Sequence, residues 1–301
     1  MVRSTDELRG IFSAIITPTR EDESIDYDVL ADLVEGQLAR GVEGFYCCGS
    51  SGEGPLLSVE ERQRVVDTVV RSARGRVPVI AHVGAPRSAD AVTLARAAAE
   101  SGADAVSAVP PYYYKYGQEE IEAYYRAILA ASDLPVILYN IPQFTGVSFD
   151  KANSAGLFAE PRVIGLKHTE HDLYALERLH SAFPEKILFN GFDEIYLSAL
   201  AAGATATVGT TVNIQPELFL AVRAAFMAGD MATASRVQTQ INHVIETLVA
   251  HGVFTATKYV ASLQGYPTSG CRAPFRPLDA GDRAALKALH EQMTEFRTTL
   301  G

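Results

Sequence analysis

The sequence has little cysteine: it contains only three, and two of them, Cys47 and Cys48, are adjacent. That spacing gives neither a disulfide framework nor a CxxC metal pair, so we expect small buried apolar residues. Long apolar runs are also missing, since none reaches the roughly 18 residues that a membrane span needs. The first residues, MVRSTDELRG, lack the apolar core of a signal peptide. These absences favour a cytoplasmic protein.

Positive charge is scarce as well. The chain has 26 lysines and arginines against 36 aspartates and glutamates, which leaves a formal net charge of −10. An acidic chain without a Lys/Arg cluster argues against nucleic acid or an anionic membrane as a partner. An anionic substrate would therefore have to be held by local dipoles and not by the overall field of the protein.

The sequence does contain a regular alternation of short β-branched apolar runs and longer segments with helical periodicity. Its 301 residues, 48% of them hydrophobic, are compatible with one large domain or two ordinary ones and with a large buried core. About eight strands are predicted, at 11–17, 44–49, 77–83, 105–109, 135–140, 163–168, 187–191 and 204–209.

Helices are predicted between these strands, and several start with capping residues, as Ser58 does before Glu60 and Glu61. Eight β/α units indicate an α/β protein with a closed (β/α)8 TIM barrel. A doubly wound open sheet is the alternative, but no glycine-rich dinucleotide turn supports it. The predicted helices are 27–40, 58–73, 88–101, 118–131, 173–183 and 193–202.

After the eighth strand the sequence predicts only helix, which is more than one closing unit needs. We expect the barrel strands and most barrel helices in 1–215, and a closing helix plus a C-terminal helical extension packed on the barrel in 216–301. The only Pro/Gly-rich connection is 265–277, so the two parts form a single structural unit. The predicted helices of the second part are 216–228, 230–251, 253–264 and 279–299.

In a (β/α)8 barrel the chemistry lies where strands end and the following loops begin. Six of the predicted strands end in polar or reactive motifs, which makes this edge of the barrel the candidate active site. The motifs are GSSGEG (49–54), PPYYY (110–114), YNIP (139–142), KHT (167–169), NGFDE (190–194) and GTT (209–211).

Lys167 is one of only six lysines and lies in the apolar run VIGLKHTE (163–170). Alternation places it on the strand face opposite to Ile164, Leu166 and His168. If those residues face the helices, Lys167 points into the barrel, where lost hydration favours the neutral, nucleophilic amine. Such a lysine is suited to form a Schiff base with a carbonyl substrate. The alternative is a lysine that pairs with a carboxylate or extends to the barrel mouth.

Tyr139 ends the neighbouring fifth strand at the matching height. A phenol about one strand spacing from an amine is suited to moving protons during imine and enamine steps. A buried tyrosine that merely finds a hydrogen-bond partner is the alternative. The pair of Lys167 and Tyr139 is more specific than either residue alone.

The GSSGEG turn offers backbone N–H groups and hydroxyls that can bind a carboxylate without a formal positive charge. It is not a serine-hydrolase elbow, because Glu53 stands where G-x-S-x-G needs glycine, and it lacks the Gly-Lys-Ser/Thr ending of a P-loop. A plain turn is the alternative.

Asp193 and Glu194 follow the seventh strand. They are either helix N-terminal charges or, at a barrel mouth, acceptors for the hydroxyls of a non-phosphorylated, sugar-derived substrate. The histidines are less informative, since His168 alternates away from Lys167 and His82 lacks a His/Asp cluster for a metal. We expect no metal site.

The motifs GSSGE, YNIP, GLKHT and NGFDE, in this order and spacing, resemble those of the pyruvate-dependent class I aldolases, which include dihydrodipicolinate synthase and N-acetylneuraminate lyase. The resemblance runs from about Gly10 to the C-terminal helices. The synthase branch has an arginine shortly after its YN-P motif, whereas residues 143–146 here are QFTG. The stretches most similar to the lyase branch are IAHVG (80–84), DAVSAV (104–109), YNIP, NGFDEI (190–195), HGVF (251–254) and CRAPFRP (271–277).

The resemblance implies that Lys167 forms an imine with the keto acid and that Tyr139 moves protons at the bond that breaks. Ser50 and Ser51 would hold the pyruvate carboxylate. In a homotetramer Tyr113 would reach the active site of an adjacent subunit, although the sequence does not decide which tyrosine of the PPYYY run crosses the interface. The residues implied to line the pocket for a sugar tail are Thr169, Gly191, Asp193, Glu194 and Thr210.

Two stretches depart from the lyase pattern. After the eighth strand, Thr210 stands where that branch has serine and Val212 where it has tyrosine. Glu170 and His171 follow Thr169 where small residues are expected. Both departures could reshape the tail pocket. The imine chemistry is therefore a firmer expectation than the identity of the sugar.

The resemblance thus implies a small-molecule enzyme that cleaves N-acetylneuraminate reversibly to N-acetylmannosamine and pyruvate, without metal or organic cofactor. Three alternatives stay open: a related aldolase or dehydratase for another 2-keto-3-deoxy sugar acid, a dihydrodipicolinate synthase-like enzyme, and a non-catalytic protein that binds a keto acid.

Overall fold

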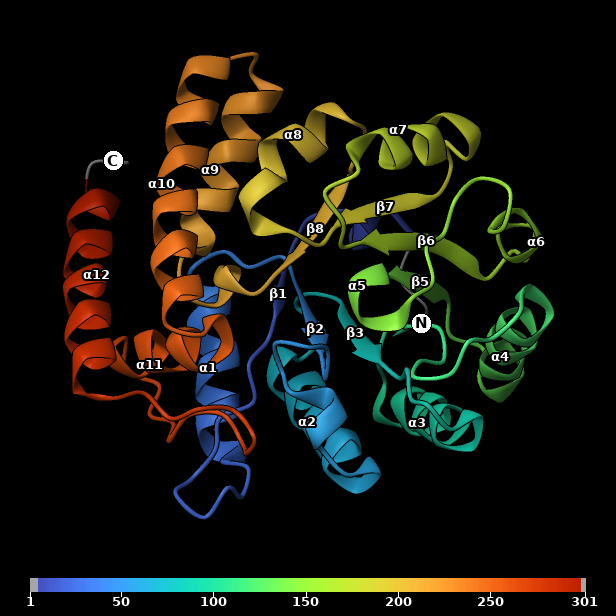
Figure 1. Ribbon diagram of the computed structural model, residues 1–301, viewed down its shortest axis with the longest axis horizontal. Helices are drawn as coiled ribbons and strands as arrows, with labels where there is room; N and C mark the ends of the chain where they lie inside the picture. The colour runs from blue at the N-terminus through green and yellow to red at the C-terminus, as the bar shows by residue number, and fades with distance from the viewer. Residues whose placement is uncertain (1–4, 299–301) are drawn as a thin grey trace.

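The computed structural model describes residues 5–298. Eight parallel strands form a closed barrel in chain order, with β1 paired to both β2 and β8 (Figure 1). This closure confirms the predicted (β/α)8 fold and excludes the open sheet. The strands are β1 (Ile11–Ala14), β2 (Gly44–Cys47), β3 (Val79–His82), β4 (Ala105–Ala108), β5 (Val136–Asn140), β6 (Val163–His168), β7 (Ile187–Asn190) and β8 (Ala206–Gly209).

The helices begin where the sequence supplies caps. At Ser58 the side chain accepts from the Glu61 amide while the Glu61 carboxylate accepts from the Ser58 amide, so two free donors are satisfied. No described helix has the length and apolar character to cross a membrane. The helices are α1 (Tyr27–Ala39), α2 (Val59–Ala73), α3 (Ser88–Ser101), α4 (Gln118–Ala131), α5 (Pro142–Thr145), α6 (Ala155–Phe158), α7 (Leu173–Ala182), α8 (Tyr196–Ala201), α9 (Pro216–Met227), α10 (Met231–Ala250), α11 (Val253–Leu263) and α12 (Ala280–Thr298).

Predicted and observed elements agree closely, with differences at their ends. The short helices α5 and α6 were not predicted, and the segment 193–195 is a 3-10 turn that precedes α8. The predicted helix 279–299 is α12, and residue 299 lies outside the described residues. The division of the chain at residue 215 stays a prediction.

One side chain faces the opposite way from the prediction. Ile164 was expected beside Leu166 on the outer face of β6, but it belongs to the cluster inside the barrel. A β-bulge is the cause, because Val136 pairs with Val163 whereas Ile137 pairs with Gly165, and the alternation shifts at the skipped residue. Beyond the bulge, Leu166 packs outward and Lys167 faces the interior, as predicted.

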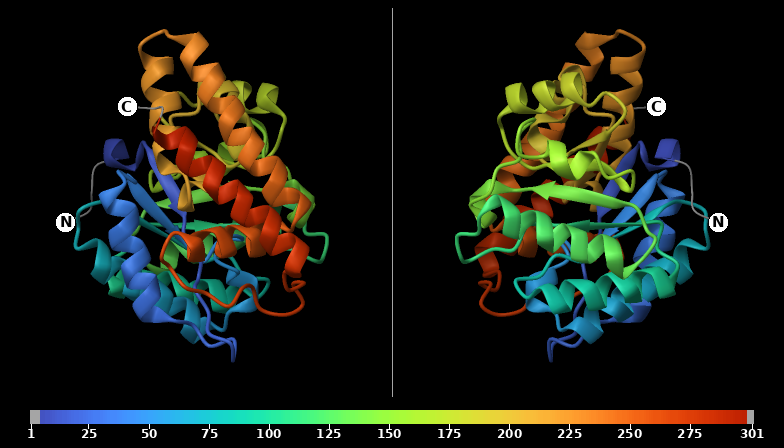
Figure 2. Two further views of the ribbon diagram at one scale, coloured as in Figure 1. Left: turned by 90° about the vertical axis from the view of Figure 1, so that its left-hand side faces the viewer. Right: turned by 90° about the vertical axis from the view of Figure 1, so that its right-hand side faces the viewer.

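The C-terminal helices lie along one side of the barrel. In the left view of Figure 2, α12 runs across α10 and α11 on the outside of the molecule. Leu286 and Leu289 of α12 are buried against this layer, and α10 buries Val237, Ile241 and Val244. The extension is therefore part of the same core as the barrel.

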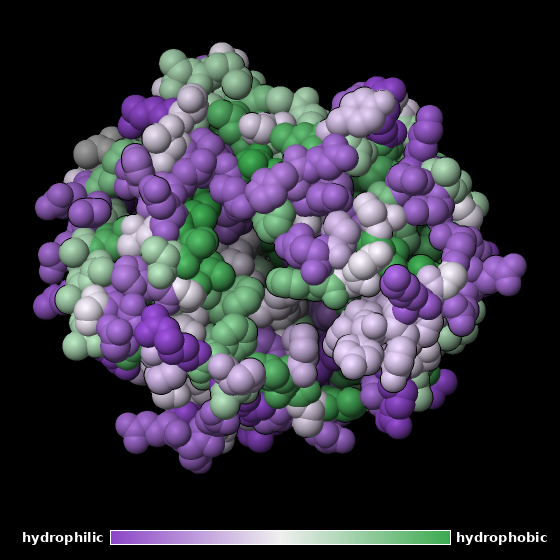
Figure 3. Space-filling model, viewed as in Figure 1, coloured by the Kyte–Doolittle hydropathy of each residue, from purple (hydrophilic) through white to green (hydrophobic). Residues whose placement is uncertain are grey.

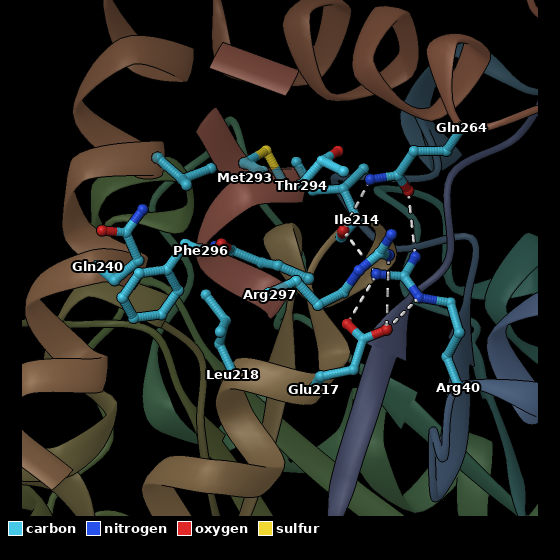
Figure 4. A pocket seen from close by; sticks show the side chains of 12 residues that line it. Arg40, Ile214, Glu217, Leu218, Gln240, Gln264, Met293, Thr294, Phe296 and Arg297 are labelled. Carbon is cyan, nitrogen blue, oxygen red and sulfur yellow. Dashed lines mark hydrogen bonds and ion pairs between the residues drawn. The ribbon is translucent and has the colours of Figure 1, made fainter. Parts of the chain in front are cut away.

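Arg40, the C-cap residue of α1, fastens this extension to the barrel (Figure 4). Its guanidinium donates two hydrogen bonds to the Glu217 carboxylate, at 2.7 and 2.8 Å, and one to the Ile214 carbonyl at 2.8 Å. A fourth bond, 3.1 Å long, reaches Gln264 after α11. The cavity at this joint measures only about 20 Å³, room for one water at most. It is a structural joint and not a binding site.

We expect Arg40→Met to lower the free energy of unfolding by about 1–3 kcal/mol, because it removes both hydrogen bonds to the Glu217 carboxylate and leaves the Ile214 carbonyl with Gln264 as its donor. Arg71→Met is the matched control, since its pair with Asp67 is exposed and should contribute about 0–0.5 kcal/mol. Thermal and denaturant unfolding measure both variants. Equal losses would contradict the role of Arg40.

Candidate active site

A cavity of about 270 Å³ opens at the carboxyl ends of the strands. In Figure 3 the face seen in Figure 1 is hollowed near its middle, beside the position of α5, and hydrophobic side chains border the hollow. All predicted site residues except Tyr113 line this cavity. Its lining is Ala14, Tyr46, Gly49, Ser50, Ser51, Tyr139, Ile141, Gln143, Phe144, Lys167, Thr169, Gly191, Phe192, Asp193, Glu194, Val208, Thr210, Thr211, Ile245, Val249, Val253 and Phe254.

Lys167 reaches the cavity from the end of β6 and is only 5% exposed. Tyr139 is its partner in the register of β5 and β6. The Lys167 Nζ lies 3.8 Å from the centre of the Tyr139 ring and 4.8 Å from that of Tyr46. No carboxylate of the described residues forms an ion pair with it. The amine is thus surrounded by aromatic rings, and its nitrogen has no ion-pair partner in the described chain.

The Tyr139 ring is held by two edge-to-face contacts, with Tyr46 at 6.1 Å and His82 at 5.8 Å between ring centres. His82 is itself fixed, because Nδ1 lies 3.1 Å from the Cys48 carbonyl and Nε2 accepts from the Val109 amide at 3.3 Å. Burial lowers the pKa of His82 well below its usual value, so the ring is neutral. Through its ring contact, His82 holds the Tyr139 ring in this orientation.

The loop after β2 presents the predicted carboxylate-binding groups. Ser51 is buried and its hydroxyl lies 2.7 Å from that of Thr210. Within the described residues the Ser50 and Ser51 amides have no protein acceptor. Close packing makes Gly54 necessary, since a Cβ there would lie 1.9 Å from the Cys48 carbonyl oxygen. The turn therefore leaves free donors on two residues that line the cavity.

Glu53 in this loop was not recognised from the sequence as a structural anchor. Its backbone is left-handed, with φ +56°, and its buried carboxylate forms an ion pair with Lys258 of α11. The carboxylate also accepts from the Arg272 amide at 2.8 Å, and Lys258 donates to the Gly270 carbonyl at 2.8 Å. The signal in the sequence that could have revealed this ion pair was Lys258, a lysine on the apolar face of a predicted helix.

Asp193 is a buried carboxylate beside β8. Its Oδ2 accepts from the amide and the hydroxyl of Thr211 at 2.7 and 2.8 Å, while Oδ1 has no partner within the described residues. Burial raises the pKa of Asp193 to about 6 despite those bonds. The Thr169 hydroxyl is likewise buried without a partner in the described chain. These two buried atoms therefore have unused hydrogen-bonding capacity within the described chain.

Glu194 lies at the mouth and is fixed from two sides. His171 Nε2 is 3.2 Å from its Oε1, and Asn242 of α10 donates to its carbonyl at 3.0 Å. Gln238, one turn earlier on α10, donates to the Asp193 carbonyl at 3.0 Å. The sequence analysis did not identify Gln238 or Asn242 as site residues, although both lie on the helix face that also carries the cavity residue Ile245.

Comparison with known proteins places the chain in a family. The model of the dihydrodipicolinate synthetase family matches residues 7–293. The N-acetylneuraminate lyase of Rhizobium meliloti (strain 1021) is 41% identical over 281 residues, which cover 93% of this chain and 94% of that protein. The chain belongs to the dihydrodipicolinate synthetase family.

Solved structures of this family have the same fold. The N-acetylneuraminate lyase of Fusobacterium nucleatum superposes with a TM-score of 0.91 at 32% identity, over 95% of this chain and 99% of that one. A catalytic lysine mutant of the Ruminococcus gnavus sialic acid aldolase superposes with a TM-score of 0.95 at 29% identity, over 99% of each chain.

The tyrosines that follow β4 do not line the cavity of about 270 Å³, whereas the other predicted site residues do. Tyr113 is 88% exposed with φ +84° and does not line the cavity of its own chain. Tyr112 instead lines a second, apolar cavity of about 340 Å³, which adjoins the first through Tyr139 and Phe144. One chain alone therefore leaves Tyr113 away from the candidate active site.

The remaining histidine of the β6 motif is structural. His168 is buried on the outer side of the strand, with Nδ1 3.2 Å from the Asn140 amide nitrogen and Nε2 3.0 Å from the Asp172 carbonyl. Burial lowers its pKa. No group of three or more His, Cys, Asp and Glu side chains among residues 5–298 is placed to hold a metal ion. The absence of a metal or organic cofactor stays a prediction.

We expect Asp193→Asn to stabilise the protein at neutral pH, because the raised pKa means that ionising Asp193 costs folding energy. The folded protein binds the proton more tightly than the unfolded chain between the ordinary pKa of 3.8 and about 6. This cost grows as the pH rises through that window and amounts to about 2–3 kcal/mol above it. Asparagine keeps the acceptor for Thr211. The midpoint of thermal unfolding should rise at pH 7.5 and converge with that of the wild type toward pH 4. A less stable variant at pH 7.5 would contradict this account.

Proposed function

We propose that this protein is a pyruvate-dependent aldolase that cleaves N-acetylneuraminate reversibly to N-acetylmannosamine and pyruvate through an imine at Lys167. The observation that carries the proposal is the buried Lys167 amine, which has no anionic partner in the described chain and lies 3.8 Å from the centre of the Tyr139 ring. A lysine kept out of water and without an ion pair to a carboxylate is suited to nucleophilic attack. The relatives named N-acetylneuraminate lyase support the choice of substrate.

In the proposed reaction, Lys167 attacks the ketone carbon of the open-chain keto acid, and loss of water gives a protonated imine. The imine draws electrons from the C3–C4 bond as that bond breaks. Tyr139 accepts the proton of the C4 hydroxyl while its own phenol proton passes to Tyr113 of a second subunit, and C4 leaves as the aldehyde carbon of N-acetylmannosamine. The enamine then takes a proton at C3, and hydrolysis releases pyruvate and regenerates Lys167.

The polarity of the cavity favours a substrate with one carboxylate and a hydroxylated tail. The free Ser50 and Ser51 amides are suited to the carboxylate. Lys167 is the only cationic side chain among the described residues of the lining, so a second carboxylate or a phosphate would be buried beside Asp193 without a counter-charge. A polyol tail would lie at the end of the cavity where Asp193 is located. The other residues that border this end are Thr169, Gly191, Glu194 and Thr210.

The proposed activity is tested by trapping the imine. Incubation with pyruvate and borohydride should add a reduced adduct to Lys167, located by peptide mass spectrometry. Lys186, which is also buried but donates to the Val163 carbonyl at 2.7 Å, is an internal control and should stay unmodified. Lys167→Met should lose pyruvate release from N-acetylneuraminate by on the order of 10³-fold or more.

The outcomes separate the alternatives. An unmodified Lys167 would exclude the Schiff-base mechanism and leave a keto-acid-binding protein. An adduct without pyruvate release from N-acetylneuraminate would keep the chemistry and point to another 2-keto-3-deoxy sugar acid. A panel of such acids, with pyruvate release as the readout, identifies which one is cleaved.

We also propose that the enzyme is a homotetramer in which Tyr113 of one subunit completes the proton relay of another. The exposed Tyr113 and the apolar cavity beside Tyr139 support this arrangement, since each is a surface that a second copy could cover. The cytoplasmic location stays a prediction.

The assembly is tested by subunit complementation. Tyr113→Ala and Lys167→Met should each be strongly impaired, whereas co-expression of the two chains should restore part of the activity, because an intact Lys167 then meets Tyr113 of its neighbour. Tyr114→Ala, at an exposed position next to it, is the control for general damage. Native mass spectrometry gives the subunit number. Failure of mixed oligomers to regain activity would contradict the shared site.

A further inference from the structure

The loop after Lys167 is held rigidly on both sides. The Glu170 carboxylate accepts from Asn140 at 3.2 Å and lies 3.4 Å from the Ser148 hydroxyl, so it is anchored to the segment after β5. Asp172 caps α7 through the Ala175 amide at 2.9 Å. The residue between these two anchors, His171, therefore has a fixed backbone although its side chain is 67% exposed.

His171 uses this fixed position to contact the loop after β7. Its ring stacks on Phe192, with centres 4.5 Å apart and planes 27° apart, and its Nε2 lies 3.2 Å from Glu194 Oε1. Because the carboxylate can only accept, His171 must be the donor. The second oxygen of Glu194, Oε2, has no partner within the described residues, and Glu194 and Phe192 both line the cavity.

The two contacts together restrict the rotamers of Glu194. A glutamate at a barrel mouth has three rotatable bonds, and ordering it costs free energy that substrate binding would otherwise have to supply. The hydrogen bond fixes Oε1, and the stack on Phe192 fixes the donor. Oε2 is then oriented before the substrate arrives.

We infer that His171 is a positioning residue that selects long, hydroxylated acceptors by holding Glu194 ready for a distal hydroxyl. His171 itself lies outside the lining of the cavity and acts through Glu194. This inference rests on the proposed function, since it presumes that the tail of the keto sugar acid extends from Lys167 toward Glu194. His171 would affect recognition of the hydroxylated tail of the substrate and not of its carbonyl end, with which it has no contact.

The test compares two acceptors in the condensation with pyruvate: N-acetylmannosamine, and glyceraldehyde, which lacks the distal hydroxyls. The readout is the ratio of their kcat/KM values, which a general structural defect would not change. His171→Phe keeps a ring to stack on Phe192 but loses the donor, whereas His171→Gln keeps a donor and loses the ring. Thermal unfolding verifies that both variants fold.

We expect His171→Phe to lower the ratio by about three- to tenfold, as for the loss of one oriented hydrogen bond, and His171→Gln to retain most of it. In a Glu194→Gln background, His171→Phe should have no further effect, because the two residues act as one unit.

An unchanged ratio in His171→Phe, or a ratio lost in His171→Gln and kept in His171→Phe, would overturn the inference. A wild-type enzyme that forms the pyruvate adduct at Lys167 but does not prefer the long acceptor would overturn it while leaving the imine chemistry intact. An unmodified Lys167 would overturn both proposals.

Discussion

The ion pair between Glu53 and Lys258 joins the two parts of the chain on which the cavity depends. One partner belongs to the loop that carries Ser50 and Ser51, and the other to α11 of the C-terminal extension. Both side chains are almost completely buried. Removing one partner of such a pair leaves an uncompensated charge, which costs about 3–5 kcal/mol. The loop that carries Ser50 and Ser51 is therefore tied at its left-handed turn to the helical extension.

At the mouth of the cavity, by contrast, one charged group lowers the stability of the folded protein. Asp193 is kept in a buried position where one oxygen has no partner in the described chain, and its ionisation opposes folding. Gly209 permits this approach, since a Cβ there would lie 2.1 Å from Asp193 Oδ1. A destabilising group held so firmly is typical of binding sites, where stability is given up for an oriented polar atom.

The sequence was sufficient to predict the features that depend on local residue patterns. Strand periodicity predicted the barrel, and the matched ends of β5 and β6 placed Tyr139 beside Lys167. Features that depend on distant residues were not predictable. The bulge that turns Ile164 inward arises from pairing between strands, and the ion pair of Glu53 needs a helix near the end of the chain. His171 had no visible role until the fold brought it to Glu194.

The closure of the barrel by β1 and β8 also sets the order of events during synthesis. β1 lies near the start of the chain, and its edge stays unpaired until β8 has left the ribosome. Lys258 is translated later still, so the nascent chain cannot bury Glu53 beside its cation before most of the protein has been made. The candidate active site is thus among the last parts to form, and a ribosome that stops early releases a chain without it.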